Sequence, residues 1–415
     1  MPSTITWKGD APAIAQVDTL TVGGTIETTD NFTMTINGKA VNVVAGSTVA
    51  ATVAATIATT WNACTIPEFK EITAAATTGG ALTLTADVPG KPFTVTVATT
   101  ETGGGAADSQ TFSKASTIAS SGPNDWSTAA NWSGGVLPAS GDTVVLENSK
   151  SDILYGLDQH AVTLASLIVS QTFLATVGLP RTNSGGYVEY RPQYLQIGAT
   201  LCTIGNGSGQ GSGRIKLDFY SIQTACTILN AGSAAETGVP SILLKGTHAS
   251  NVLNLIKGIV GIAFFAGETA TLATVNVGYF SNINGDSNLA MSSGVTLTTI
   301  KQSGGSIFAA SNITTLTQYA GLLTLQGSAT IGTATLEGTL YDQSTGTFTT
   351  LTVLGKYDRR QSMAAKTCTN VTLYKGSEWH DPFHTVTCTN GIILSECVPE
   401  DVTLDIAPNL TVTLN

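Results

Sequence analysis

The stretch Leu297-Thr-Thr-Ile-Lys-Gln-Ser-Gly304, followed by Ile313-Thr-Thr-Leu-Thr-Gln-Tyr-Ala-Gly321, decides the fold. Gly338 and Gly355 continue the same spacing, so that four glycines lie 17 residues apart. Each glycine follows a short run of Thr and branched aliphatic residues, which favour strands. A fixed period with one turn glycine per unit is typical of stacked repeats. The pattern predicts the rungs of a parallel β-solenoid, with the four glycines above one another.

The solenoid is expected to begin near residue 143 and to run to residue 415, with rungs of less regular length before residue 297. Its interior should contain Val, Ile, Leu, Thr and Cys, with Leu316, Leu336 and Leu351 pointing inward. Cys202 and Cys226 occupy matching strings, and so do Cys368 and Cys388. We interpret these pairs as small apolar residues stacked between rungs, with a disulfide between rungs as the alternative.

The composition excludes several classes of protein. Only 11% of the 415 residues are charged, against about 25% in ordinary soluble proteins. The net charge of −10 repels phosphate backbones and predicts no nucleic-acid partner. The sequence contains no uninterrupted run of 18 apolar residues, so it predicts no membrane span. The first residues lack the basic and apolar regions of a signal peptide, which favours folding in a cytoplasm.

Residues 1–115 are expected to form a small α+β sandwich. Alternating residues 32–36 lead into Asn37-Gly38, a strong hairpin signal. A helix should follow, with Val49, Val53, Ile57 and Trp61 along one apolar ridge. Residues 82–84 and 93–97 should then form a second pair of strands.

The hairpin Thr35-Ile-Asn-Gly-Lys-Ala-Val41, the helix ending in Trp61-Asn62 and the strand Gly79-Gly-Ala-Leu-Thr-Leu-Thr85 resemble the hook-IN motif of flagellins. Trp61 replaces the Ile that is usual in that motif. The module is also similar to domains of tailed-phage structural proteins and prophage proteins. The resemblance implies an extracellular assembly role for residues 1–115 rather than chemistry.

Residues 116–142 are expected to form a linker and the N-terminal cap of the solenoid. The segment from Asp125 to Leu146 contains Trp126 and Trp132, and it resembles the opening segment of bacterial surface β-helices of the autotransporter kind. The first rung of a solenoid must have its core covered. We therefore assign Trp126 and Trp132 to the cap, with a sugar-binding aromatic pair as the alternative.

The sequence offers few candidates for chemistry, and it predicts no catalytic residue, no cofactor and no metal. His380 and His384 are spaced like metal ligands on a helix, but Pro382 disfavours that helix. Glu337 and Asp342 are the candidates for an acid and base pair on the regular rungs, as in a polysaccharide depolymerase. Solvation of the surface is the alternative explanation for this pair.

Aromatic and charged side chains gather in one segment that contains Tyr187, Glu189, Tyr190, Arg191 and Tyr194. The candidates for binding are Tyr187, Tyr190, Arg191 and Tyr194. Such residues are enriched in protein interfaces, and Tyr also stacks on sugars. We expect these four residues to bind a partner, either another protein or a glycan of the host surface.

The function that these patterns favour is a non-enzymatic virion structural protein of a tailed phage, as a decoration, fibre or tail appendage. Its partners would be other virion proteins and copies of itself, with a trimer as one form. The first alternative is a bacterial surface adhesin or extracellular filament subunit, and the second is a β-helix polysaccharide depolymerase.

Overall fold

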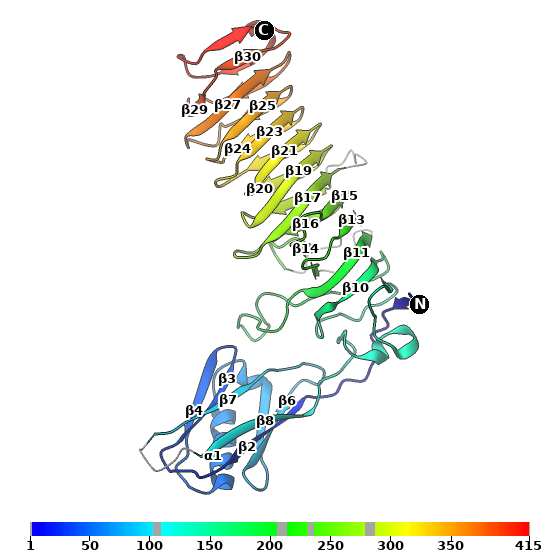
Figure 1. Ribbon diagram of the computed structural model, residues 1–415, viewed down its shortest axis with the longest axis vertical. Helices are drawn as coiled ribbons and strands as arrows, with labels where there is room; N and C mark the ends of the chain where they lie inside the picture. The colour runs from blue at the N-terminus through cyan, green and yellow to red at the C-terminus, as the bar shows by residue number, and fades with distance from the viewer. Residues whose placement is uncertain (1, 103–108, 206–213, 231–235, 279–286, 415) are drawn as a thin grey trace.

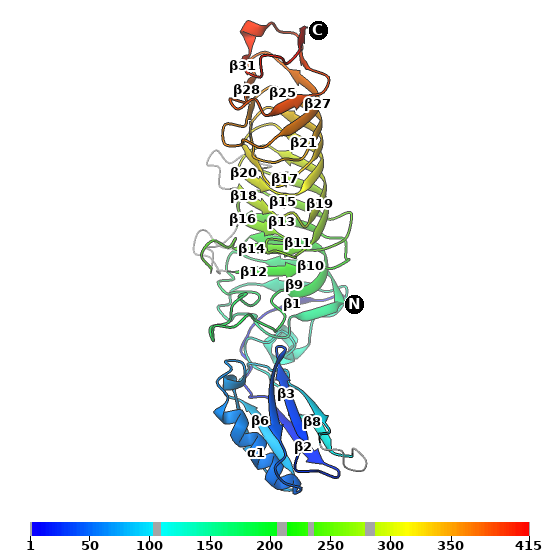
Figure 2. The same cartoon turned by 90° about the vertical axis from the view of Figure 1, so that its left-hand side faces the viewer.

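The computed structural model describes residues 2–102, 109–205, 214–230, 236–278 and 287–414. The molecule is elongated, with a small domain at one end and a long stack of parallel strands beyond it (Figure 1). Figure 2 shows the same stack from the side, with the helix α1 on the outside of the small domain. The predicted fold class, mainly β with a small α+β sandwich and a parallel β-solenoid, is confirmed.

The small domain is a sandwich of two antiparallel sheets and one helix. One sheet has the order β5-β6-β2-β8 and the other β4-β3-β7. The elements are β2 (Val17–Gly23), β3 (Asn31–Ile36), β4 (Lys39–Val44), α1 (Ala50–Ala63), β5 (Ile72–Ala76), β6 (Ala81–Ala86), β7 (Thr96–Thr100) and β8 (Thr111–Ile118). No helix among the described residues is long and apolar enough to cross a membrane.

Local sequence signals in this domain predict most of its elements. Asn37 and Gly38 both have positive φ, 52° and 71°, and connect β3 to β4 as the hairpin signal predicts. Helix α1 buries Val53, Ile57 and Trp61 against the sheets, but Val49 precedes the helix and is exposed. The ridge is therefore one residue shorter than predicted.

The predicted pairing of residues 82–84 with 93–97 is wrong. Strand β6 pairs with β2 and β5, whereas β7 pairs with β3 in the other sheet. Leu82 and Leu84 point into the same core as Val95, and this shared core holds the two sheets together. Burial of alternate residues does not reveal which sheet a strand joins.

The small domain is inserted into the solenoid rather than placed before it. Strand β1 (Thr4–Thr6) pairs in parallel with β9 (Thr143–Leu146) of the solenoid. Ile5 lies in the solenoid core, and the chain enters and leaves the small domain side by side at the Ile14–Ser121 bridge. The predicted domain of residues 1–115 is corrected accordingly: its compact part runs from about residue 15 to Ile118.

Three tryptophans close the first rung of the solenoid. Trp132 lies between Trp7 and Trp126, with ring centroids 4.9 Å and 4.5 Å away. All three side chains are buried in the solenoid core. The structure thus places Trp126 and Trp132 inside the molecule, where a sugar cannot stack on them, and it adds Trp7 from the segment ahead of the inserted domain.

The solenoid strands form two parallel ladders on opposite sides of one apolar core. The first contains β1, β9, β10 (Asp158–Val169), β11 (Leu195–Gly205), β13 (Ala225–Asn230), β15 (Val252–Leu255), β17 (Ala270–Val277), β19 (Val295–Gln302), β21 (Asn312–Gln318), β23 (Ile331–Leu336), β25 (Phe348–Val353), β27 (Lys366–Leu373), β29 (Val386–Cys388), β30 (Ile392–Leu394) and β32 (Val412–Leu414). The second contains β12 (Ile215–Asp218), β14 (Ile242–Lys245), β16 (Gly258–Ile262), β18 (Ser287–Met291), β20 (Ser306–Ala309), β22 (Leu322–Leu325), β24 (Thr339–Asp342), β26 (Lys356–Asp358), β28 (Glu378–His380) and β31 (Thr403–Asp405).

Three of the four periodic glycines, Gly321, Gly338 and Gly355, stack as predicted, but Gly305 takes the place of Gly304 in the column because Ser306 is in register with Leu322. A Cβ atom on Gly321 would lie 2.7 Å from the carbonyl oxygen of Gly305, and one on Gly338 would lie 2.7 Å from that of Gly321. A Cβ atom on Gly355 would lie 2.4 Å from the carbonyl oxygen of Gly338. Each of these glycines therefore allows the turn of one rung to approach the backbone of the previous rung.

The interior contains the Val, Ile, Leu and Cys residues that the sequence predicts, but the predicted interior threonines of β21, β23 and β25 lie on the outer side, where they are half-buried or exposed. Leu316, Leu336 and Leu351 are at most 1% exposed. Cys202 pairs in register with Cys226, and Cys368 with Cys388, and all four are free thiols. The interpretation as stacked apolar residues is confirmed for these cysteines.

Candidate functional site

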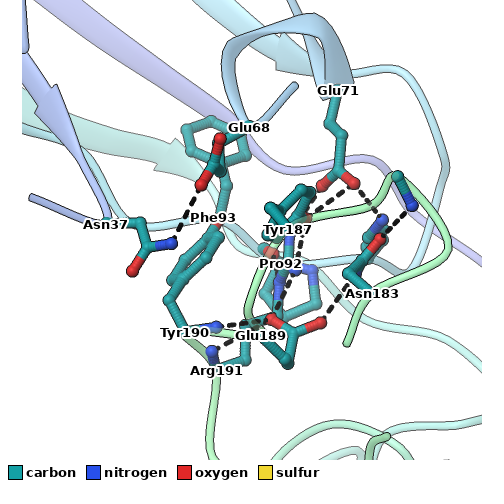
Figure 3. A network of polar contacts seen from close by, with 12 residues as sticks. Asn37, Glu68, Glu71, Pro92, Phe93, Asn183, Tyr187, Glu189, Tyr190 and Arg191 are labelled. Carbon is teal, nitrogen blue, oxygen red and sulfur yellow. Dashed lines mark hydrogen bonds and ion pairs between the residues drawn. The ribbon is translucent and has the colours of Figure 1, made fainter. Parts of the chain in front are cut away.

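The strongest concentration of polar contacts lies between the inserted domain and the solenoid (Figure 3). A loop of residues 181–194 leaves the solenoid between β10 and β11 and contacts the inserted domain. The loop is held by its own hydrogen bonds, from Asn183 N to the Tyr187 carbonyl oxygen and from Glu189 N to the Arg181 carbonyl oxygen. We call this contact region the joint. Its main residues are Glu71, Lys91, Tyr187, Glu189 and Arg191.

Arg191 is the centre of the joint. Its guanidinium donates to Glu71 Oε2 and to Glu189 Oε1, each at 2.9 Å, and to the Pro92 carbonyl oxygen at 2.6 Å. The side chain is only 6% exposed, and it also lies 4.4 Å from the centre of the Tyr190 ring. Arg191 thus connects a loop of the solenoid to two segments of the inserted domain.

Glu71 is the main acceptor on the inserted domain. Its carboxylate accepts hydrogen bonds from Lys91 Nζ at 2.6 Å, Tyr187 Oη at 2.7 Å and Arg191 Nη2 at 2.9 Å. Burial raises the pKa of Glu71, but these three donors outweigh burial and hold the pKa below its ordinary value. Glu71 is therefore ionised at neutral pH while the joint is closed.

Glu189 orients the loop from the solenoid side. Its Oε1 atom accepts from the backbone N–H groups of Tyr190 and Arg191, each at 3.0 Å, and its Oε2 atom accepts from Asn183 Nδ2 at 2.7 Å. The Glu189 carboxylate is 1% exposed. Glu71 and Glu189 balance the charges of Lys91 and Arg191, so the joint buries no net charge.

A second contact joins the β3–β4 hairpin to the same loop. Asn37 Nδ2 donates to the Val188 carbonyl oxygen at 3.2 Å and to Glu68 Oε1 at 2.9 Å. Glu68 in turn pairs with Lys39. Tyr190 packs against the core of the inserted domain, and burial raises its pKa to about 12. The hairpin turn thus also serves as a docking point.

Of the four residues predicted to bind a partner, three lie in the joint. Tyr187, Tyr190 and Arg191 contact the inserted domain of their own chain, so in this conformation they are already engaged. Tyr194 lies elsewhere: its hydroxyl donates to Glu268 Oε2 at 3.1 Å, and Lys245 Nζ lies 4.5 Å from its ring centre. Sequence reasoning missed Glu71 and Lys91 as partners of this loop, because no local pattern links charges so far apart in the chain, and it assigned Asn37 only to the hairpin turn.

The structure separates Glu337 and Asp342. Glu337 is exposed, whereas Asp342 lies in the solenoid interior and is 0% exposed. Asp342 Oδ2 contacts Arg359 Nη1 at 3.0 Å and Lys366 Nζ at 3.1 Å, and it accepts from Tyr357 Oη at 2.8 Å. The proposed acid and base pair is therefore not a pair on the surface.

The histidines near residue 380 do not face a common site. His380 Nε2 contacts Glu378, whereas His384 lies 3.9 Å from Asp405. Asp381 accepts hydrogen bonds from the backbone N–H groups of Thr385 and Val386, which shapes the turn after β28. Across the described ranges, no three His, Cys, Asp or Glu side chains gather closely enough to hold a metal ion.

The joint should open in acid. Because the pKa of Glu71 in the closed joint is below its ordinary value of 4.5, ionised Glu71 stabilises the joint above that pH. This stabilisation is lost as the pH falls through the lowered pKa. We expect the amide hydrogens of residues 181–191 to exchange faster in this acidic range than the intrinsic pH dependence of amide exchange predicts. In Glu71→Gln the additional acid response should be absent, and an unchanged response in that variant would contradict the assignment.

Neither a protein-family model, nor a curated protein, nor a solved structure matches this chain.

Proposed function

We propose that the chain is a non-enzymatic structural protein of a tailed-phage virion, serving as a decoration, fibre or tail appendage. In this proposal the inserted domain attaches to the particle and the solenoid projects from it or packs along it. The observation that carries the proposal is the placement of one compact domain at one end of a rod, with a buried polar joint between them (Figure 1).

Two features support a fixed angle between the attaching domain and the rod. The chain crosses between them twice, once near Ile14 and once near Ser121, and these two residues are paired by a β-bridge. The joint adds a third connection, because Arg191 and Tyr187 both contact Glu71. Three connections resist bending and twisting better than a single flexible linker would. Such a connection suits a subunit whose rod must hold one direction on a large assembly.

The interior of the rod is consistent with a structural role. Continuous apolar ladders fill it from Val144 to Leu394. The acidic residue that the sequence offered for catalysis, Asp342, points into this interior and contacts Arg359 and Lys366. Partners of the proposed subunit are other virion proteins and copies of itself.

Removing the inserted domain should abolish incorporation without unfolding the rod. Residues 14–121 can be excised and Ala13 joined to Gly122 through one glycine, because a Cβ atom on Gly122 would lie 3.5 Å from Ala13 Cα. This excision keeps β1 and Trp7, which a deletion of residues 1–115 would remove. We expect the excised protein to show the circular dichroism of a β-rod and to be missing from purified particles.

The matched control is the intact chain with Val49→Ala, an exposed position of the inserted domain. It should incorporate at the level of the unmodified protein. Full incorporation of the excised rod would contradict the proposal. Recovery of the intact protein on the bacterial surface, and not on particles, would favour the adhesin instead.

A further inference from the structure

The first ladder carries a regular array of threonines on its outer side, where Thr333 is exposed and its neighbours in the array are half-buried. Strands β21, β23 and β25 are stacked in register, so that Thr315, Thr333 and Thr350 form one column and Thr317, Thr335 and Thr352 form a second. We call these six residues the Thr face. Thr274 and Thr299 extend the first column by two rungs, and Thr372 extends the second by one. Figure 1 shows these strands side by side.

The Thr face has a rigid support. On each rung, one inward residue lies between the two threonines. These inward residues are Leu316, Ala334 and Leu351, and each is at most 1% exposed. Threonine is branched at Cβ, which restricts its χ1 angle. Backbone and side chains are therefore fixed on every rung, and the hydroxyl and methyl groups repeat from strand to strand.

The hydroxyl groups of the Thr face have no partner within the described part of the protein. No hydrogen bond joins any of these six side chains to another protein group. The face itself carries no charge. The nearest charged positions in the ladder are Lys301, in register with Thr317, and Glu337, two residues beyond Thr335. The surface thus offers six free hydroxyls and six methyl groups in a two-dimensional lattice.

The spacing of this lattice is close to that of ordered water. Successive strands lie about 4.8 Å apart, and residues two apart on one strand lie about 6.6 Å apart. In a tetrahedral network of O–H···O bonds of about 2.8 Å, next-nearest oxygens lie about 4.6 Å apart and stacked layers repeat at about 7.4 Å. Along the rod, the strand spacing and the spacing of next-nearest oxygens differ only slightly. Over three rungs this difference adds up to much less than the length of one hydrogen bond.

These observations distinguish between two possible occupants of the face. A second copy of the chain packed against it would take six hydroxyls away from water, and a buried hydroxyl without a hydrogen-bond partner is unfavourable. A water lattice supplies a partner for every hydroxyl and leaves the methyl groups between the water molecules. We propose that the Thr face binds ice. This inference is independent of the proposed role on a particle.

Partition into a growing ice crystal tests the inference on the full-length protein. We expect the protein to be enriched in the ice fraction and to slow crystal growth. Thr335→Tyr, at the centre of the face, should reduce the enrichment to that of a protein that does not bind ice, because the ring lifts the lattice from the surface. Thr345→Tyr, in an exposed turn between β24 and β25, should leave it unchanged. Unchanged circular dichroism would confirm that both variants fold.

Two results would overturn the inference. In the first, the unmodified protein is excluded from the ice fraction as fully as a protein that does not bind ice. In the second, the protein is a dimer in solution that Thr335→Tyr converts to a monomer, while ice partition is absent. The second result would assign the Thr face to contacts between copies of the chain.

Discussion

Asp342→Ala should destabilise the rungs around β24 to β27 by about 3–5 kcal/mol, the usual cost of removing one partner of a buried ion pair. Asp342 is 0% exposed and contacts two cations that are also buried, Arg359 and Lys366. Burial lowers the pKa of Lys366, and Asp342 acts against this effect by favouring the charged amine. Without Asp342 both cations would remain in the interior with no anion beside them.

The measurement should be local, because long repeat arrays do not unfold in a single two-state step. Amide hydrogen exchange gives the free energy of opening for β24, β25 and β27 separately. Glu337→Ala is the matched control, since that carboxylate is exposed in the turn that leads into β24. Its effect should stay within about 0.5 kcal/mol.

A triple variant separates buried charge from lost volume. Asp342→Leu combined with Arg359→Met and Lys366→Met replaces the three charged side chains by apolar ones, while the hydroxyls of Ser344 and Tyr357 stay in place. Replacing a complete buried ion cluster is often neutral or stabilising. We therefore expect the triple variant to recover most of the stability that Asp342→Ala loses. If both proteins were equally unstable, packing around residue 342 would explain the loss, and charge would not.

The architecture of this chain could be predicted from its sequence because its signals are local and repeated. Gly304 to Gly355 reveal the rung, and alternation around Leu316, Leu336 and Leu351 reveals the interior. Asn37-Gly38 identifies a hairpin from two residues. Each of these features depends on neighbours within one rung or one turn, and a sequence displays such neighbours directly.

The arrangement of the domains could not be predicted in the same way. Strand β1 has three residues and pairs with β9, about 140 positions later in the chain. Nothing in Thr4-Ile-Thr6 itself indicates that partner. Because the strand is separated from the solenoid by a complete domain, the insertion is visible only in the structure.

The charged residues were misjudged for a related reason. The sequence offers Asp342 as one member of an acid and base pair, or as a solvated carboxylate, but it is buried. Charges that pair across rungs or domains can instead be buried. Asp342 and Lys366 are 24 residues apart, and Glu71 and Arg191 are 120 residues apart. Pairing over such separations is set by the fold and leaves no local pattern.

Arg191→Ala should release the inserted domain from the solenoid. The substitution removes the two ion pairs that Arg191 makes and leaves the Glu189 carboxylate, which is 1% exposed, without its cation. Breaking a buried pair in this way costs about 3–5 kcal/mol. The two chain segments paired at Ile14 and Ser121 remain. We therefore expect the inserted domain to stay attached and to swing about these two segments as a hinge.

The cleft beside the joint gives such a hinge room to move. It has a volume of about 310 Å³ and is lined by Pro92, Tyr155, Asp158 and Tyr190, among others. Energy transfer between dyes on the inserted domain and on β17 should therefore show a wider distribution of distances in Arg191→Ala. Small-angle scattering should show a matching change in the radius of gyration.

Lys91→Ala is the matched control for this experiment. Lys91 contacts the same carboxylate of Glu71, but it is 16% exposed and lies entirely within the inserted domain. Because the Lys91–Glu71 pair joins two residues of the inserted domain and Arg191 stays in place, this variant should keep the narrow distance distribution. If Arg191→Ala also kept the narrow distance distribution, the two segments paired at Ile14 and Ser121 would be enough to hold the domain in place. The joint would then be a contact that forms because the domain is already in place.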